Sequence, residues 1–184
     1  PIGINAAQTA QWQIPVCLHD DKGTNACHMM TQKQESWTTP FACDAKLSTN
    51  ANGAGYYRVD MDASLWRSAV ADMANAKPAE ALSIASDFFA AFNAGKVDAN
   101  LVLELLPQFV SHSERRVMSW SSGSAGFIYR QIADEKELPQ LETYLRKLYS
   151  KQINTIDLAP LTGAASAQVF RRQTLYGMLA HTAK

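Results

Sequence analysis

The sequence predicts an α+β fold, in which a short antiparallel β-sheet or partial sandwich is followed by an α-helical superhelix. Two observations support this prediction. Residues 1–61 are rich in Thr, Asn and Gly, and their apolar residues recur at every second position, which is the period of a strand. From residue 62 onward the apolar residues recur at spacings of three and four, which is the period of a helix. We therefore predict two domains, 1–61 and 62–184.

The β part is predicted to contain two hairpins. Residues 12–18 alternate between apolar and polar, and Pro15 removes one backbone donor, so we expect an edge strand there. A turn sequence rich in Asp and Gly separates this strand from a second strand over 25–31. Two further strands are expected over 46–49 and 56–61, because an Asn-Gly turn lies between them.

About six helices joined by short loops are predicted after the strands. Asp62 is the expected N-cap of the first helix, Lys77-Pro78 ends it and opens the second, and Gly95 ends the second. We expect the remaining helices over 100–106 before Pro107, 114–120, 137–153 and 165–180, with 127–132 as an extension or a separate helix. The last helix is predicted to turn Val169, Phe170, Leu175 and Leu179 inward. Successive antiparallel pairs of this kind suggest a HEAT-like array.

Composition excludes several classes of partner. Lys plus Arg and Asp plus Glu both number 17, so the net charge is zero and the basic excess of a nucleic-acid-binding protein is missing. No apolar run approaches the ~18 residues of a membrane-spanning helix. We therefore expect no nucleic-acid and no membrane partner. The chain shows no signal-peptide pattern and begins at Pro1, which leaves targeting of a longer gene product open.

Four different short motifs follow one another along the chain. They are Trp12-Gln13-Ile14-Pro15-Val16, the segment Asn50 to Val59 with Gly55-Tyr56-Tyr57-Arg58-Val59 at its end, a helix with Trp66, and the helix segment Asp87 to Val97 with Gly95. Together they resemble the WxIPV strand, the N…GYYRV strand and the two following helices of the M1 family of zinc aminopeptidases, the gluzincins. The resemblance covers most of the chain and is strongest from Trp12 to Trp120.

This resemblance implies a fragment that holds the end of the family's β-sandwich domain and the start of its C-terminal helical domain. The parent would remove N-terminal residues from peptides, and this part would shape the substrate chamber and the contacts between domains. The implied partners are the missing catalytic and N-terminal domains and, in the full enzyme, a peptide substrate. The motif residues are expected to have structural roles; they are Trp12, Pro15, Asn50, Gly55, Tyr56, Tyr57, Arg58, Trp66, Asp87 and Gly95.

The catalytic apparatus of that family is missing from the sequence. Its zinc site needs His-Glu-x-x-His, yet none of the four histidines is followed by Glu, and the Gly-x-Met-Glu-Asn loop does not occur. We therefore expect no zinc and no hydrolysis in this chain alone, with zinc confined to the parent. No Gly-x-Ser-x-Gly elbow, P-loop or dinucleotide fingerprint is present, and the serine-rich segment 121–124 is interpreted as a loop.

Three cysteines, Cys17, Cys27 and Cys43, lie in the first quarter of the chain. A metal site with His19 and His28 is one interpretation, but neighbouring strand residues point to opposite faces, so at most three of the four ligands can converge. A disulfide is favoured, either Cys17–Cys27 or Cys27–Cys43. The cysteines resemble those of exported bacterial enzymes of the family, which implies a periplasmic or secreted location.

Two further interpretations concern charged residues and the nature of the chain. We expect Arg58 to anchor its segment to the helical domain rather than to bind substrate, with Asp87 as the candidate partner. The pairs Arg115-Arg116 and Arg171-Arg172 could face a peptide carboxylate, although solvated helix faces are the default for them. The alternative to an enzyme fragment is a stand-alone helical-repeat binding module without activity. Exposed apolar surface discriminates the two, because a fragment exposes faces that missing domains would cover.

Overall fold

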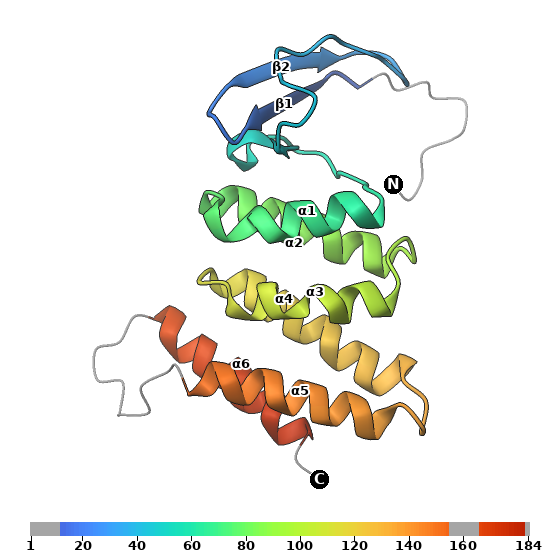
Figure 1. Ribbon diagram of the computed structural model, residues 1–184, viewed down its shortest axis with the longest axis vertical. Coiled ribbons are helices and arrows are strands. Elements are labelled where there is room, and N and C mark those ends of the chain that lie inside the picture. The colour runs from blue at the N-terminus through green and yellow to red at the C-terminus, as the bar shows by residue number, and fades with distance from the viewer. Residues whose placement is uncertain (1–11, 155–165, 183–184) are drawn as a thin grey trace. The chain divides into compact units, whose positions relative to one another are not determined.

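The computed structural model describes residues 12–154 and 166–182, and the chain divides into two compact units, Pro1–Val59 and Asp60–Lys184 (Figure 1). The first unit is a small antiparallel sheet and the second is helical, so the predicted α+β class with a helical C-terminal part is confirmed. No helix in the described residues is long and apolar enough to cross a bilayer.

The sheet of the first unit has the order β2-β1-β3. Its strands are β1 (Ile14–Asp20), β2 (Asn25–Met30) and β3 (Leu47–Ser48), and β3 reaches only the end of β1, at His19 and Asp20. Cys17 and Cys27 face each other with Cα atoms 4.1 Å apart, the spacing of a pair without ladder hydrogen bonds. Pro15 lies two residues before Cys17 in β1, so its pair with Met29 is also one without ladder hydrogen bonds. Its missing N–H therefore faces away from β2, and β1 tolerates proline although it is the central strand.

The strand predicted over 56–61 does not form. Residues 54–61 have no regular secondary structure. The GYYRV segment does not pair with another strand. Instead, the side chain of Asn50 binds the backbone of Gly55, and the hydroxyl of Tyr57 donates to the carbonyl of Thr49. Local side-chain bonds replace the ladder that the pattern predicts.

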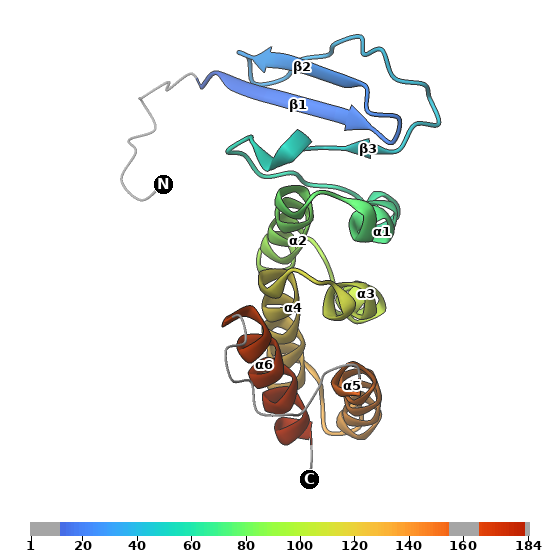
Figure 2. The ribbon, with the colours of Figure 1, turned by 90° about the vertical axis from the view of Figure 1, so that its left-hand side faces the viewer.

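The helical unit consists of two layers, with α1, α3 and α5 in one and α2, α4 and α6 in the other (Figure 2). Consecutive helices pair across the layers, and helices two apart stack within a layer, which is the arrangement of a helical-repeat array. The helices and helical turns are α1 (Ala63–Asp72), η2 (Met73–Asn75), α2 (Pro78–Asn93), α3 (Ala99–Ser111), α4 (Arg115–Phe127), the π-helical turn η3 (Ile128–Ile132), α5 (Leu138–Ile153) and α6 (Ser166–Thr182).

The helix ends follow the capping signals of the sequence. The carboxylate of Asp62 accepts from the N–H groups of Ser64 and Leu65 at 2.8 and 2.9 Å, as an N-cap should. Pro78 opens α2 at its first position, and Gly95 follows the helix with φ of 71°. These three local signals place the turns between the first helices where we expected them.

Two predicted boundaries in the middle of this unit are wrong. Pro107 lies inside α3 instead of ending it. Proline leaves the carbonyl four residues earlier without its helical donor, and here the hydroxyl of Tyr144 in α5 donates to that Leu103 carbonyl at 2.6 Å. The segment 121–124 is part of α4 and not a loop, because its two buried serines, Ser121 and Ser122, both have hydrogen-bond partners.

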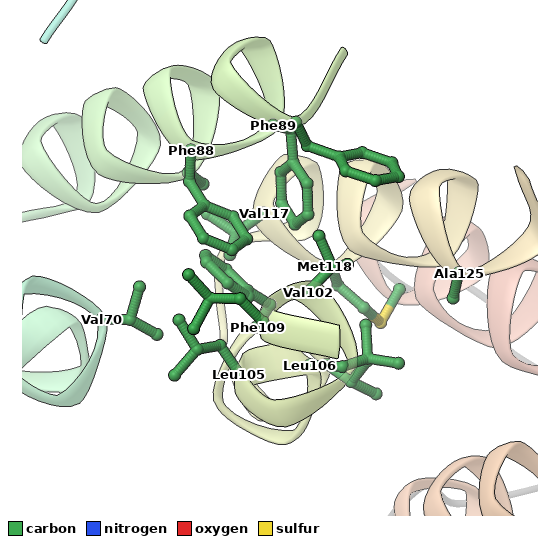
Figure 3. Close-up of a cluster of buried hydrophobic side chains, with 14 of the residues drawn as sticks. Val70, Phe88, Phe89, Val102, Leu105, Leu106, Phe109, Val117, Met118 and Ala125 are labelled. Atoms are coloured by element: carbon green, nitrogen blue, oxygen red, sulfur yellow. The ribbon is translucent and has the colours of Figure 1, made fainter. Parts of the chain in front are cut away.

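The core of the helical unit brings apolar side chains from α1, α2, α3 and α4 together (Figure 3). The rings of Phe88 and Phe109 stack with centroids 5.1 Å apart, and the edge of Phe88 meets the ring of Trp66 at 5.3 Å. Leu175 of α6 is buried as predicted, whereas Phe170 is 49% exposed because it lies under the guanidinium of Arg115 instead of in the core.

Candidate functional site

The N…GYYRV motif forms a closed loop around η1 (Ala51–Gly53). The buried amide of Asn50 accepts from the N–H of Gly55 at 2.8 Å and donates to its carbonyl at 3.1 Å. A Cβ on Gly55 would lie 2.1 Å from the ring of Tyr57, so only glycine fits beneath that ring. We call this arrangement, Asn50 with Gly55 and Tyr57, the Asn50 clasp. The Asn50 clasp explains why the motif has Asn, Gly and Tyr at these three positions.

The other two motif residues of this segment point elsewhere. The side chain of Tyr56 is fully exposed, and Arg58 is exposed as well. Asp87, the predicted partner of Arg58, is buried on α2, which also buries Glu80 seven residues earlier and therefore on the same helix face. The pairing of Arg58 with Asp87 stays a prediction.

The remaining motif residues lie in different surroundings. Trp66 is fully buried, and its indole N–H has no acceptor among the described residues while its ring packs against Phe88. Trp12, at the start of the WxIPV motif, is 71% exposed. Gly95 supplies the left-handed residue after α2, where a side chain would strain the backbone.

Cys17 and Cys27 form a disulfide between β1 and β2, and Cys43 is an exposed free thiol. The bond removes both sulfurs from the metal interpretation. His28 is occupied as well, because its Nε2 lies 2.6 Å from a carboxylate oxygen of Glu35 and its ring contacts that of Trp37. Within residues 12–154 and 166–182, no group of three His, Cys, Asp or Glu side chains could hold a metal ion.

Glu35 is the most perturbed acid of the first unit. The hydrogen bond from His28 lowers the pKa of this carboxyl to about 2, and backbone and hydroxyl donors of Thr31 and the N–H of Gln32 add to the effect. One carboxylate therefore fastens β2 to the turn after it. The arrangement closes a loop, because all of these donors lie within seven residues of Glu35.

A shallow groove between α4 and α6 is a candidate binding surface. It has a volume of about 240 Å³ and is floored by small residues of both helices; the lining residues are Ser119, Ser122, Gly123, Gly126, Arg130, Gln173, Thr174, Gly177 and Met178. We call it the α4–α6 groove. The spacing of Ser119, Gly123 and Gly126 is helical and places the three residues on one side of α4, a signal that the prediction of a loop over 121–124 excludes.

Arg130 brings a charge to the α4–α6 groove. Its guanidinium lies over Gly126, where an added Cβ would come within 3.0 Å of the Nη1 atom. No carboxylate in the described part of the chain pairs with Arg130, whose side chain is exposed. Ser122 of the groove accepts a hydrogen bond at 3.1 Å from the buried hydroxyl of Tyr149, and burial raises the pKa of this tyrosine. The groove thus combines access to helix backbone at Gly123 and Gly177, which are exposed, with one accessible cation.

Arg115 and Arg171, one arginine of each pair named from the sequence, have structural partners. Arg171 donates to the carbonyl of His112, at the end of α3, and to Gln152, so it joins α6 to α3 and α5. Arg115 stacks its guanidinium on the ring of Phe170 at 4.8 Å. Both arrangements bring helix ends together, and neither forms part of the α4–α6 groove.

The chain was compared with known families and proteins. The family model of the ERAP1-like C-terminal domain matches residues 47–184, from β3 to the end of the chain. The match includes the Asn50 clasp, the helical unit and the α4–α6 groove. A search of curated proteins found no match.

Proposed function

This chain belongs to the family of the ERAP1-like C-terminal domain, part of the C-terminal region of M1 aminopeptidases, and we propose that it is the non-catalytic C-terminal portion of a zinc metallo-aminopeptidase. The parent would remove N-terminal residues from peptides with catalytic and zinc-binding residues of other domains. The family match over 47–184 carries the proposal, and the two-layered helix array supports it.

The role we assign to this portion is to form a wall of the substrate chamber. A wall of this kind needs a rigid surface and a few groups that can bind a peptide. The α4–α6 groove offers both, because helix backbone is accessible at the exposed glycines Gly123 and Gly177 and Arg130 supplies a cation for an acidic group. The peptide substrate and the catalytic and N-terminal domains of the parent are the proposed partners.

Exposed aromatic side chains support an enzyme fragment over a stand-alone binding module. Trp12, Tyr56 and Phe127 are 71%, 106% and 47% exposed, and further domains would cover large apolar rings of this kind. Faces of this kind suit contact with further domains. The disulfide between Cys17 and Cys27 supports export to the periplasm or the outside of the cell, where disulfides persist.

The chamber role is tested with an Arg130→Ala variant in the full-length parent enzyme. We expect KM to rise by about tenfold, the value of one charge-assisted hydrogen bond, for peptides with a free C-terminal carboxylate. KM for the same peptides with an amidated C-terminus should not change, and kcat should be retained. Lys147→Ala, which removes an exposed cation of α5, is the matched control. Equal KM values for Arg130→Ala and the control would contradict the role of the groove.

A further inference from the structure

We propose that Asn52 is a site of spontaneous deamidation and that the Asn50 clasp holds this reaction in check. Asn52 is followed by Gly53, and every other asparagine of the sequence is followed by a residue with a side chain. Glycine leaves its backbone nitrogen unhindered, so Asn-Gly pairs are the chemically weakest asparagine sites in a chain. Asn52 is also exposed to the water that the reaction consumes.

The reaction needs no reagent other than water. The deprotonated backbone nitrogen of Gly53 attacks Cγ of Asn52, a bond forms between them, and the Cγ–Nδ2 bond breaks with release of ammonia. Water then opens the resulting cyclic imide. Opening at Cγ gives aspartate, and opening at the main-chain carbonyl gives isoaspartate, in which the chain runs through the side chain. No electron transfer is involved.

The folded loop opposes the first step. Asn52 and Gly53 have φ values of 58° and 62°, as in the hairpin turns for which Asn-Gly is preferred. The N–H of Gly53, which must lose its proton and attack, donates to the carbonyl of Asn50 at 2.8 Å. A second bond, from the N–H of Ala54 to the carbonyl of Ala51 at 3.3 Å, closes the same turn. The nitrogen can reach Cγ only after this turn opens.

The Asn50 clasp sets how often the turn opens. The buried side chain of Asn50 makes two hydrogen bonds to Gly55, across the turn that contains Asn52. The hydroxyl of Tyr57 adds a third, to Thr49 at 2.8 Å, on the near side of the loop. These bonds tie together the two ends of the segment, so opening requires that they break at the same time.

The product cannot return to the original loop. Isoaspartate adds one methylene to the main chain between Asn50 and Gly55 and leaves a carboxylate in the turn. The longer main chain then prevents the side chain of Asn50 from making both hydrogen bonds to Gly55. The ring of Tyr57 also loses its contact with Gly55. Deamidation therefore acts as a one-way release of the GYYR segment, in which Tyr56 and Arg58 are exposed.

The proposal is tested by incubating the intact chain at 37 °C and following peptide 47–58 by mass spectrometry. Trypsin cuts after Lys46 and Arg58, so this peptide carries Asn50 and Asn52, and fragmentation of the peptide in the mass spectrometer assigns the mass change to one of the two. We expect the folded chain to deamidate at least about tenfold more slowly than the synthetic peptide of the same sequence, since several hydrogen bonds must break first. The Asn50→Ala variant should approach the rate of the peptide.

The matched control is Asn25→Ala, which removes another exposed asparagine of the same unit. This variant should keep the wild-type rate at Asn52. Because Asn50→Ala could unfold the first unit, the wild-type chain is also measured across a urea series, where the rate should rise to that of the peptide as the chain unfolds. Equal rates in the folded chain and the peptide, or a rate independent of urea, would overturn the proposal.

Discussion

Single side chains of the first unit close loops that the backbone alone leaves open. The side chains of Asn50 and Glu35 each bind two backbone groups across a turn: Asn50 binds the N–H and the carbonyl of Gly55, and Glu35 accepts from the N–H groups of Thr31 and Gln32. The family motif singled out Asn50 in the sequence. The role of Asn50 depends on its hydrogen bonds to Gly55, which hydrophobic periodicity does not predict. Glu35 carried no signal, because a glutamate between polar neighbours looks like any solvated residue.

Glu35 gives the chain a predictable pH dependence. Its pKa is about 2 when folded and near 4.5 when unfolded, chiefly because of the hydrogen bond with His28. The folded state therefore binds the proton less readily, and the stabilisation is present above pH 4.5 and is lost as the pH falls toward 2. Melting temperatures of wild type and Glu35→Gln should differ at pH 6 and converge as the pH approaches 2.

The control for this experiment is Glu135→Gln, which neutralises an exposed carboxylate of the helical unit. Its melting temperature should follow that of the wild type throughout. A constant difference between Glu35→Gln and wild type from pH 6 to pH 2 would show that the ionised carboxylate of Glu35 does not stabilise the fold.

Helix α3 shows how one element depends on another for its length. A proline in a helix interior usually ends or bends it, and on this ground we predicted an end before Pro107. The helix continues to Ser111 because Tyr144, more than thirty positions along the chain in α5, satisfies the carbonyl that Pro107 leaves open. Local signals cannot contain such a donor, so this boundary was beyond prediction from the sequence.

The Tyr144→Phe change is expected to lower the free energy of unfolding by about 1–2 kcal/mol, because the Leu103 carbonyl loses its donor. In a Pro107→Ala background the same change should have a smaller effect, since the restored N–H of residue 107 can bind that carbonyl. Denaturant titration of the double-mutant cycle measures the difference.

Tyr129→Phe serves as the matched control, because its hydroxyl donates to Glu142 and not to α3. Its effect on the free energy of unfolding should be the same with proline or alanine at position 107. If Tyr144→Phe also has equal effects in both backgrounds, the explanation for the length of α3 is wrong.

The helices and hairpin that the sequence predicted best are those with strong local signals. Asp62, Pro78 and Gly95 bound their helices as expected, and the strands around Cys17 and Cys27 formed from alternating residues. The α4–α6 groove was missed because its two sides come from helices some fifty positions apart. The serine-rich sequence on its α4 side is typical of a loop. In the structure these serines are helical, and the backbone and Tyr149 supply the partners of their hydroxyls.

At the scale of the whole molecule, the predicted link between Arg58 and Asp87 deserves a direct test. Asp87 is buried, and a buried carboxylate without a counter-charge is strongly destabilising. We expect Arg58→Ala to lower the melting temperature by several degrees, while Arg116→Ala, the loss of an exposed arginine of α4, leaves it unchanged. A melting temperature of Arg58→Ala equal to that of wild type would count against the pairing.

The family assignment and the proposed function describe the chain as one portion of a larger enzyme. Residues 47–184 match the ERAP1-like C-terminal domain, and the described residues hold no group that could bind the zinc of the family. Under the proposed function, the catalytic residues would be encoded elsewhere in the same gene. This requirement is the central claim, because the chamber role of the helical unit depends on it.

The most direct test is to read the gene immediately upstream of the codon for Pro1. We predict that the reading frame continues for several hundred codons and encodes both His-Glu-x-x-His and Gly-x-Met-Glu-Asn. A stop codon there, or a start codon with a signal peptide directly before Pro1, would contradict the account and identify a free-standing relative that binds its partners without cutting them.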